Sequence, residues 1–412
     1  MAGPLAGPLE GLRVLDLSTV ILGPWISVML GDWGADVIKI EPPGGDTTRS
    51  VGSMRNPRMA SLFMNCNRNK RSITMDLARP SAQAAFRRLV KSADIVVHNM
   101  RPRPAAKLGL SWAELSAINP RLILCVALGY GRGGPYADLP AYDDLIQGIS
   151  GVAGLIGHHT EGDPRYVPTA FADKVGSLTA LSGILAALYR RERTGKGQEI
   201  EMPMFEAMVS FLLVEHLTGS AFEPPLGPDG YIRQMSPLRR PFKTKDGFIA
   251  ATPFTDRHWE RFFALGGEPD LIRDPRFNSI VARTDNMPAL YVKLGQMLAK
   301  QTTAYWLDAL AKADIPVAPV NSLDAVMKDR HLEAVGFFST DTHPTEGTVR
   351  RTGSAISFFG SPANSRRPAP RLGEHSVEVL SEAGFSPAEI EALIAEKAVS
   401  MDGAKPASGK GE

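Results

Sequence analysis

Residues 11–41 read GLRVLDLSTVILGPWISVMLGDWGADVIKIE. Two short runs rich in Val, Ile and Leu, RVLDLS at 13–18 and DVIKIE at 36–41, flank a helical pattern, PWISVMLGDWG, at 24–34. A strand, a helix and a second strand in this order form the unit from which parallel sheets are built. The stretch therefore predicts two parallel strands joined by a helix that covers them.

The same alternation continues along the first third of the chain. Further apolar runs are SITMDL at 72–77, DIVVHN at 94–99 and LILCVAL at 122–128, and a helical pattern, PSAQAAFRRLVKSA, occupies 80–93. This order predicts an α/β fold with a mainly parallel sheet covered by helices. Ligands of such open sheets bind beyond the carboxyl ends of the strands. The loops to search therefore follow Leu17, Leu77, Asn99 and Leu128.

The second half of the chain predicts a smaller domain. The pattern from 143 to 219 is helical, and EPPLGPDG at 223–230, with three prolines and two glycines, predicts a linker. Beyond it, GFIAATP is typical of a strand, and amphipathic patterns between 258 and 313 predict helices. The chain then continues through a β-like region to a final helix near 374–397, and the nearly apolar-free end predicts a disordered tail.

The composition favours a small-molecule partner. The 412 residues carry 46 basic and 44 acidic side chains, a formal net charge of +2, which favours neither a nucleic-acid nor a membrane-surface partner. The first residues lack the pattern of a secretory signal, and the run 175–189 is too short to span a membrane. Two cysteines, Cys66 and Cys125, fit packed thiols in a reducing cytosol. We therefore expect a cytoplasmic protein.

Several familiar site patterns are excluded by their spacing. RTGKGQ lacks the residues of a phosphate-binding Walker loop, and the glycines of GYGRGGPY do not form the GxGxxG fingerprint of nicotinamide and flavin enzymes. His158 and His159 are adjacent and point apart, and no zinc-type histidine spacing occurs. No GxSxG elbow is present. We expect no metal, no nicotinamide and no flavin.

One acid stands at the start of the longest apolar run. In YVPTAFADKVGSLTALSGILAALYRRERTGKGQ, residues 166–198, Asp173 precedes the run 175–189. A carboxylate there either caps a buried helix or acts as a nucleophile, because the free N–H groups and dipole of a helix N-terminus favour negative charge. The local spacing alone favours the cap.

Seven stretches, read together, resemble one family. They occur in the order GLRVLDLSTVILGP, GDWGADVIKIEPPGGDTTR, NRNKRSITMDL, ADIVVHNMRPRPAAKLGL, NPRLILCVALGYGRGGPYADLPAYDDLIQ, AFADKVGSLTALSGILAALYRRERTGKGQ and PRLGEH. This series resembles the class III CoA-transferase family, of the formyl-CoA transferase and carnitine CoA-transferase type.

The resemblance implies a fold and an assembly. It implies a large Rossmann-like CoA-binding domain whose N-terminal part is 1–222, a small α/β domain with linkers at 223–325, and a return segment at 326–398 that completes the large domain. Residues 399–412 remain the predicted disordered tail. Two subunits are expected to form an interlocked homodimer.

The resemblance also implies site residues. Asp173 matches the family nucleophile, which forms aspartyl anhydride and aspartyl-CoA thioester intermediates with acyl-CoA as a substrate. Arg101 and Arg103 lie close enough in sequence to assist with the CoA phosphates. Asn99 also suits a turn at the end of a strand. The family's CoA-contacting positions fall on Val20, Ile21, Leu22, Met75, Leu77, Asn99, Met100 and Lys107.

Two alternatives to CoA transfer stay open. The same fold hosts α-methylacyl-CoA racemases, which carry a histidine where this chain has Tyr142, a side chain that titrates near ~10 and suits α-proton abstraction poorly. A non-catalytic acyl-CoA-binding protein is the other alternative. Its motivation is Pro42, which stands where some members have a basic residue.

The expected reaction moves CoA from succinyl-CoA to a dicarboxylic acid. Arginine suits bidentate pairing with a carboxylate. The candidates for binding the free carboxylate of the acceptor are Arg49, Arg132, His158 and Arg165.

Overall fold

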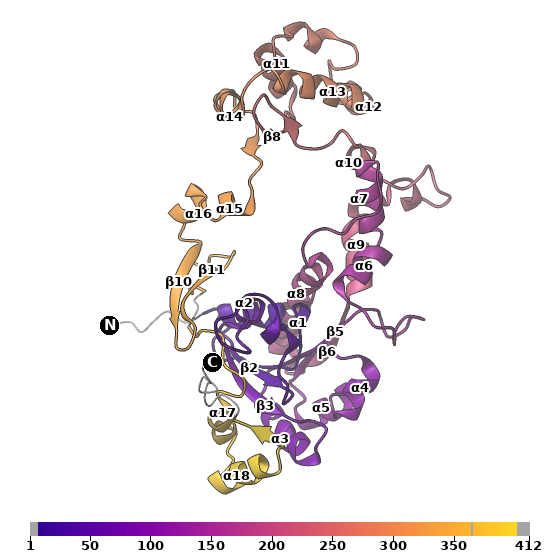
Figure 1. Cartoon of the computed structure of the whole chain (residues 1–412). Coiled ribbons are helices and arrows are strands. Elements are labelled where there is room, and N and C mark those ends of the chain that lie inside the picture. The colour runs from indigo at the N-terminus through magenta and orange to yellow at the C-terminus, as the bar shows by residue number, and fades with distance from the viewer. Residues whose placement is uncertain (1–6, 364–365, 402–412) are drawn as a thin grey trace. The chain divides into compact units, whose positions relative to one another are not determined.

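The computed structural model describes residues 7–363 and 366–401, which divide into two compact units (Figure 1). The described residues of unit 1 fall in Met1–Ser150, Val167–Phe211 and Glu333–Glu412, and those of unit 2 in Gly151–Tyr166 and Leu212–Leu332. Unit 2 includes Gly151–Tyr166 because α7 (Val152–Thr160) contacts α10 (Ile232–Met235).

Unit 1 is built on a seven-stranded sheet with the order β12-β3-β2-β1-β4-β5-β6. Every pairing is parallel except that of β12, which runs antiparallel to β3. The fold is therefore mixed α/β with a large, mainly parallel sheet, as the alternating pattern predicts. The strands are β1 (Arg13–Asp16), β2 (Asp36–Glu41), β3 (Lys70–Met75), β4 (Ile95–His98), β5 (Ile123–Leu128), β6 (Gln198–Pro203) and β12 (Val399–Ser400).

Helices cover both faces of this sheet (Figure 1). A core of side chains from the strands packs against one group, and α8 contacts α1, β5 and β6 on the other face. The first group consists of α3 (Pro80–Val90), α5 (Trp112–Ile118), α17 (Ser376–Glu382) and α18 (Pro387–Ala395). The second consists of α1 (Leu22–Asp32), α2 (Ser61–Asn67) and α8 (Phe171–Thr194).

The long helix α8 is a core element of unit 1. Its buried residues recur every three or four positions from Ala172 to Arg191, which places them on one face. Gly176 lies on this face, and a Cβ atom there would stand 2.9 Å from the Leu22 side chain. Glycine thus lets α8 approach the start of α1 closely. Gly195, at φ 70°, ends the helix in the left-handed conformation typical of a C-terminal glycine.

Three sequence-based expectations differ from the structure. Residues 198–203, inside the stretch predicted as helical, form the strand β6, whose exposed edge position does not require a continuous apolar run. The single final helix predicted near 374–397 is two helices, because the chain turns at Gly384 (φ 80°). The predicted tail from residue 399 begins with the paired strand β12, and its remainder from 402 lies outside the described residues.

Unit 2 combines a three-stranded antiparallel sheet with helices. Its order is β7-β8-β9, and its core is rich in aromatic side chains, among them Trp259, Phe262 and Trp306. The strands are β7 (Phe242–Lys243), β8 (Phe248–Ala251) and β9 (Val317–Pro319). The main helices are α11 (Asp256–Leu265), α12 (Ile280–Asp285), α13 (Met287–Leu298) and α14 (Thr303–Lys312), and α15 (Leu323–Val326) follows β9.

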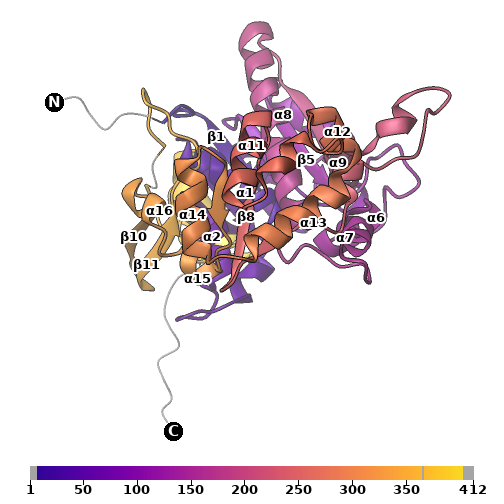
Figure 2. The same cartoon turned by 90° about the horizontal axis from the view of Figure 1, so that it is seen from above.

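The remaining elements complete the two units. The hairpin strands β10 (Phe338–His343) and β11 (Gly347–Thr352) run antiparallel, side by side in both views (Figure 1, Figure 2). Both cysteines are free and buried, as expected of packed thiols. The other helices are α4 (Pro102–Lys107), α6 (Asp143–Ile149), α9 (Met204–His216) and α16 (Arg330–Ala334).

Candidate active site

The site begins where the strand order of unit 1 reverses. β1 pairs with both β2 and β4, so the loops that leave β1 and β4 diverge at the carboxyl edge of the sheet. Two hydrogen bonds join these loops: Thr19 N donates to Asn99 Oδ1 at 3.0 Å, and Asn99 Nδ2 donates to Thr19 O at 2.9 Å. Asn99 therefore holds the two loops together at the place where open α/β sheets bind ligands.

A buried ionic network supports the loop after β1. Asp16 Oδ2 accepts from Lys70 Nζ at 2.9 Å and from Ser27 Oγ at 2.6 Å, and all three side chains are buried. Lys39 Nζ donates to Ser18 O at 2.9 Å and pairs with Asp46 at 3.1 Å. Charges removed from water in this way are tolerated only when each finds partners. Lysines on β2 and β3 thus fix the backbone of the loop.

Val20 adopts a backbone conformation that β-branched residues rarely accept. Its φ is 70°, in the left-handed region, and its N–H donates to Asp46 Oδ1 at 3.3 Å. A non-glycine residue persists there only where its surroundings impose it, at a cost on the order of 1–3 kcal/mol. The acid of the buried network therefore helps to hold the strained turn that opens α1.

Beside this turn lies a cavity of about 420 Å³ in unit 1. It contains six of the residues expected from the sequence, namely Val20, Leu22, Asn99, Met100, Arg101 and Asp173. The remaining lining comes from Thr19, Thr47, Pro104, the 127–129 end of β5, the 137–143 segment and Met204. The loops after β1, β4 and β5 and the start of α8 therefore converge on one space.

The other expected contacts lie elsewhere in unit 1. Met75 and Leu77 are buried in the core between the sheet and its helices, and Ile21 precedes α1; none of the three lines this cavity. Arg103 and Lys107 line an adjoining cavity of about 410 Å³, which shares Arg101 and Pro104 with the first. Arg103 pairs there with Asp138 at 3.1 Å.

Asp173 lies in the first turn of α8 and does not cap it. The helix starts at Phe171, and no side-chain hydrogen bond caps its N-terminus at Ala170. The backbone N–H of Asp173 donates instead to Asp143 Oδ1 at 2.9 Å. A second acid thus satisfies the helix end, and the carboxylate of Asp173, only 8% exposed, lines the cavity.

The surroundings make Asp173 a perturbed acid. Burial, and next the negative charge of Asp143, raise its pKa to about 7, and Lys174 opposes them in part. The carboxylate therefore gains and loses its proton close to neutral pH. A strongly shifted carboxyl in a cavity is a candidate for chemistry.

Asp143 is the site residue that sequence reasoning missed. The pair Asp143 and Asp144 resembles an ordinary solvated helix start, yet Asp143 Oδ2 accepts from Gln147 Nε2 at 2.6 Å while its other oxygen holds the Asp173 N–H. Gln147 Oε1 in turn accepts from Val167 N at 2.8 Å. Contacts across 30 residues leave no local signal in the sequence, so only the tertiary structure reveals them.

Of the four residues expected to bind the acceptor carboxylate, two are paired with acids inside the fold and two belong to unit 2. Arg49 is buried and forms two 2.8 Å hydrogen bonds with Glu41, so its assignment to the acceptor is wrong: its charge is already neutralised inside the fold. Arg132 pairs with Glu199 at 2.6 Å and Glu201 at 2.9 Å. His158 and Arg165 belong to unit 2.

Two further properties concern metals and membranes. Across residues 7–363 and 366–401, no three His, Cys, Asp or Glu side chains are grouped so that they could hold a metal ion. Among those same residues, α8 alone has the length and apolar composition needed to cross a membrane, and half of its apolar window is buried inside the structure.

Known proteins resemble the chain over nearly its full length. A family model described as CoA-transferase family III matches residues 9–376. The succinate–glutarate CoA-transferase of Agrobacterium fabrum is 34% identical, covering 91% of this chain and 95% of its own. The acetyl-CoA:oxalate CoA-transferase of Acetobacter aceti is 35% identical, covering 91% and 96%. The crystal structure of a CAIB/BAIF family protein from Brucella suis is 33% identical, with a TM-score of 0.77 over 92% of this chain and 100% of its own. The chain belongs to CoA-transferase family III.

Proposed function

We propose that the protein transfers CoA from succinyl-CoA to a dicarboxylic acid, with Asp173 as the nucleophile. The observation that carries this proposal is the placement of Asp173: a buried carboxylate with its own N–H satisfied by Asp143, facing a cavity at the carboxyl edge of the sheet in a family III chain. A carboxylate suits the task because an acyl anhydride or thioester on it keeps the group-transfer energy of the incoming thioester.

The reaction proceeds through alternating anhydride and thioester intermediates. The ionised Asp173 attacks the thioester carbonyl, a C–O bond forms as the C–S bond breaks, and an anhydride and CoA thiolate result. The thiolate attacks the aspartyl carbonyl, which releases succinate and leaves an aspartyl-CoA thioester. The acceptor carboxylate attacks this thioester to form a second anhydride, and the returning thiolate releases the new acyl-CoA and regenerates Asp173.

The strand-end loops supply a binding surface for CoA. Val20, Leu22 and Met100 offer apolar contact beside Asp173, and Arg101 borders both cavities. Arg103 and Lys107 in the adjoining cavity provide the cations that phosphates require. We propose that the acyl thioester lies in the first cavity and that the phosphates extend toward the second.

The choice of substrates rests on the relatives. The names of the two relatives above contain glutarate and oxalate, both dicarboxylates, as an acid partner, and the name of the first also contains succinate. No described residue of the Asp173 cavity is a histidine, and Tyr142 occupies the position of the racemase histidine, exposed at 68%. No observation favours racemisation over transfer.

We further propose a homodimer of interlocked subunits in the cytoplasm. Leu178, Leu185 and Tyr189 lie on α8 away from its buried face and are exposed, which is typical of a surface that a partner covers. The buried free thiols of Cys66 and Cys125 suit a reducing compartment. Sedimentation of a species with the mass of one 44.5 kDa chain would contradict the dimer.

The test combines a substrate screen with trapping of the intermediate. Succinyl-CoA is incubated with glutarate, malate, oxalate and monocarboxylates, and each new acyl-CoA is identified by mass spectrometry. Hydroxylamine should modify Asp173, and Asp173→Ala should lower kcat by a factor on the order of 10³ or more, because the covalent relay is lost. Asp144→Asn, which changes the neighbouring exposed acid, is the matched control. Transfer that survives in Asp173→Ala, or an enzyme that ignores succinyl-CoA, would refute the proposal.

A further inference from the structure

Unit 2 contains a cavity that the proposed CoA transfer does not use. Its volume is about 540 Å³, within the range of about 300–1,000 Å³ that is typical of small-molecule sites. Every residue that lines it belongs to unit 2. The lining comes from Tyr231, Arg233, the 239–242 segment, the 250–254 segment, Trp259, Ile280, Arg283, Thr284, Met287, Tyr291 and Leu294.

Apolar rings and chains form most of the wall. Trp259 and Phe242 belong to the buried core of the unit, and Met287 and Leu294 of α13 add aliphatic surface. The Trp259 ring is fixed in part by Arg283, whose guanidinium carbon lies 6.0 Å from the ring centroid. Such a wall stabilises the carbon skeleton of a ligand by removing its surface from water.

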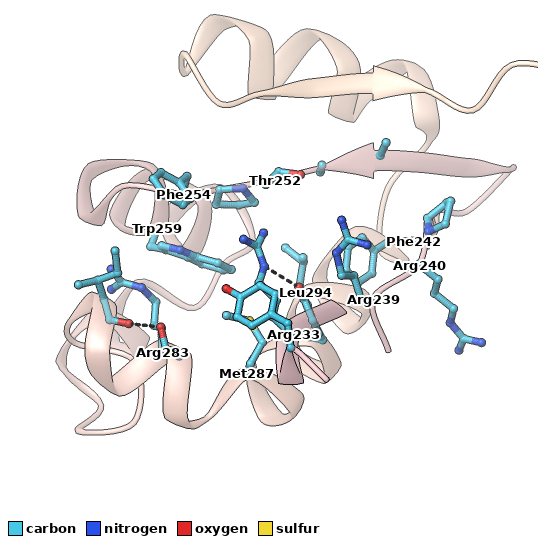
Figure 3. A pocket seen from close by; sticks show the side chains of 18 residues that line it. Arg233, Arg239, Arg240, Phe242, Thr252, Phe254, Trp259, Arg283, Met287 and Leu294 are labelled. Atoms are coloured by element: carbon cyan, nitrogen blue, oxygen red, sulfur yellow. Dashed lines mark hydrogen bonds between the residues drawn. The ribbon is translucent and has the colours of Figure 1, made fainter. Parts of the chain in front are cut away.

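Three arginine side chains that line the same cavity are not paired with acidic side chains among the described residues. In the part of the chain that the structure describes, Arg233, Arg239 and Arg240 form no ion pair with a carboxylate, although all three line the cavity. Arg233 Nε donates to Tyr291 Oη at 3.4 Å, and the Tyr231 side chain is a second hydrogen-bonding neighbour. In Figure 3, Arg233 and Arg239 lie toward the centre of the group, and Arg240 points away from it. Two guanidinium groups without a carboxylate partner among the described residues, the partly buried Arg233 and the exposed Arg239, therefore line the cavity beside its apolar wall.

Arg283 provides the contrast within the same cavity. Its Nη1 donates to Phe277 O at 2.8 Å, and its Nη2 pairs with the Asp256 carboxylate. The charge of Arg283 is neutralised within the fold, so this arginine supports the wall. The charges of Arg233 and Arg239 remain available to a ligand.

We propose that this cavity binds an organic carboxylate with a large apolar body, such as an arylalkanoic acid. The carboxylate accepts hydrogen bonds from Arg233 and Arg239, since the planar fork of arginine matches a carboxylate, and the hydrocarbon part packs against Trp259. A short dicarboxylate would leave most of the apolar wall in contact with water. The site is independent of Asp173, so it stands whether or not the proposed transfer reaction is correct.

The experiment titrates the full-length protein with 3-phenylpropionate by calorimetry and tryptophan fluorescence. We expect one ligand per chain and a fluorescence change that is lost in Trp259→Phe. The uncharged 3-phenylpropionamide should bind at least about tenfold more weakly, and Arg239→Gln should weaken 3-phenylpropionate by about tenfold, because a hydrogen bond to a charged group is removed. Arg273→Gln, which changes an exposed arginine of unit 2 outside the cavity, should bind as the wild type does.

Several results would overturn this site. They are the absence of binding at millimolar ligand, equal binding of acid and amide, an affinity unchanged in both Arg233→Gln and Arg239→Gln, or tighter binding of AMP, which would indicate a nucleotide site. Titration of Asp173→Ala separates this proposal from the transfer reaction. The variant should bind 3-phenylpropionate normally even though it is inactive in transfer.

Discussion

Two aspartates of unit 1 occupy buried positions near the same edge of the sheet and meet opposite surroundings. Asp16 ends β1, where Lys70, Lys39 and two serine hydroxyls outweigh the effect of burial and hold its pKa well below the usual range. Asp173 begins α8, where burial and the charge of Asp143 raise its pKa to about 7. Both aspartates are buried, so a difference in exposure does not explain why their pKa values shift in opposite directions.

The comparison shows that neighbours, more than depth, decide what a buried carboxylate does. Asp16 accepts hydrogen bonds from Lys70, Ser18 and Ser27, so its ionised form is fully satisfied and chemically inert. Within the described part of the chain, no hydrogen bond is made by the carboxylate of Asp173, which lines a cavity. Because only Lys174 opposes burial and the charge of Asp143, the pKa of Asp173 stays near 7, which marks this acid as a candidate for chemistry.

The largest effect on stability is expected when the charge of Asp16 is removed. Asp16→Asn leaves Lys70 without its ion-pair partner inside the fold, so we expect a loss of about 3–5 kcal/mol in the free energy of unfolding. Urea unfolding at constant pH measures it, with the exposed Asp144→Asn as the control. A loss below about 1 kcal/mol would show that the network tolerates an unpaired lysine. If Asp16→Asn does not fold, Lys70→Met provides the same measurement.

Removal of the charge of Asp173 should raise the free energy of unfolding, whereas removal of the charge of Asp16 should lower it. Because its folded pKa lies above the unfolded value, the folded protein binds the extra proton, and stability falls as the pH rises toward about 7. Asp173→Asn does not titrate, so at pH 8 it should be more stable than the wild type by roughly 2–4 kcal/mol. The difference in the free energy of unfolding between Asp173→Asn and the wild type should be about half as large at pH 5 as at pH 8. A pH-independent gap would show that Asp173 is ionised throughout.

The smallest effect is expected from substitutions of Asp143, which test its influence on the pKa of Asp173. Asp143→Asn keeps an oxygen for the Asp173 N–H but removes the like charge, so the pKa of Asp173 should fall. The acid limb of the transfer rate against pH should move to lower pH by less than about one unit. Asp143→Ala also removes the hydrogen-bond acceptor and should lower the rate at every pH. An acid limb that stays in place in Asp143→Asn would mean that burial alone sets the pKa.

The sequence predicts much of the fold because its signals are local. The first five strands lie in short runs rich in Val, Ile and Leu, as parallel strands covered on both faces require, and the structure places a strand in each run. β6 was not predicted because it is an edge strand that contains Glu199 and Glu201. The break between α17 and α18 depends on one glycine inside an otherwise helical pattern.

The site was predictable where it follows from topology. The loop after Asn99 and the turn at Val20 lie at the carboxyl edge, as the rule for open sheets states, and both line the cavity with Asp173. The partnership of Asp143 with Asp173 was not predictable, because its hydrogen bond joins two helices that no sequence spacing relates. The neutralisation of Arg49 by Glu41 was hidden for the same reason.

The short strand β12 has a consequence for aggregation. Val399 and Ser400 pair with Met75 and Thr74, and they cover one edge of β3, all six residues of which are buried. A chain cut before Val399 would expose the edge of β3 at Thr74 and Met75 to other chains. Open, apolar strand edges are templates for intermolecular pairing. Val399 and Ser400 thus shield this part of the edge of the sheet from pairing with other chains.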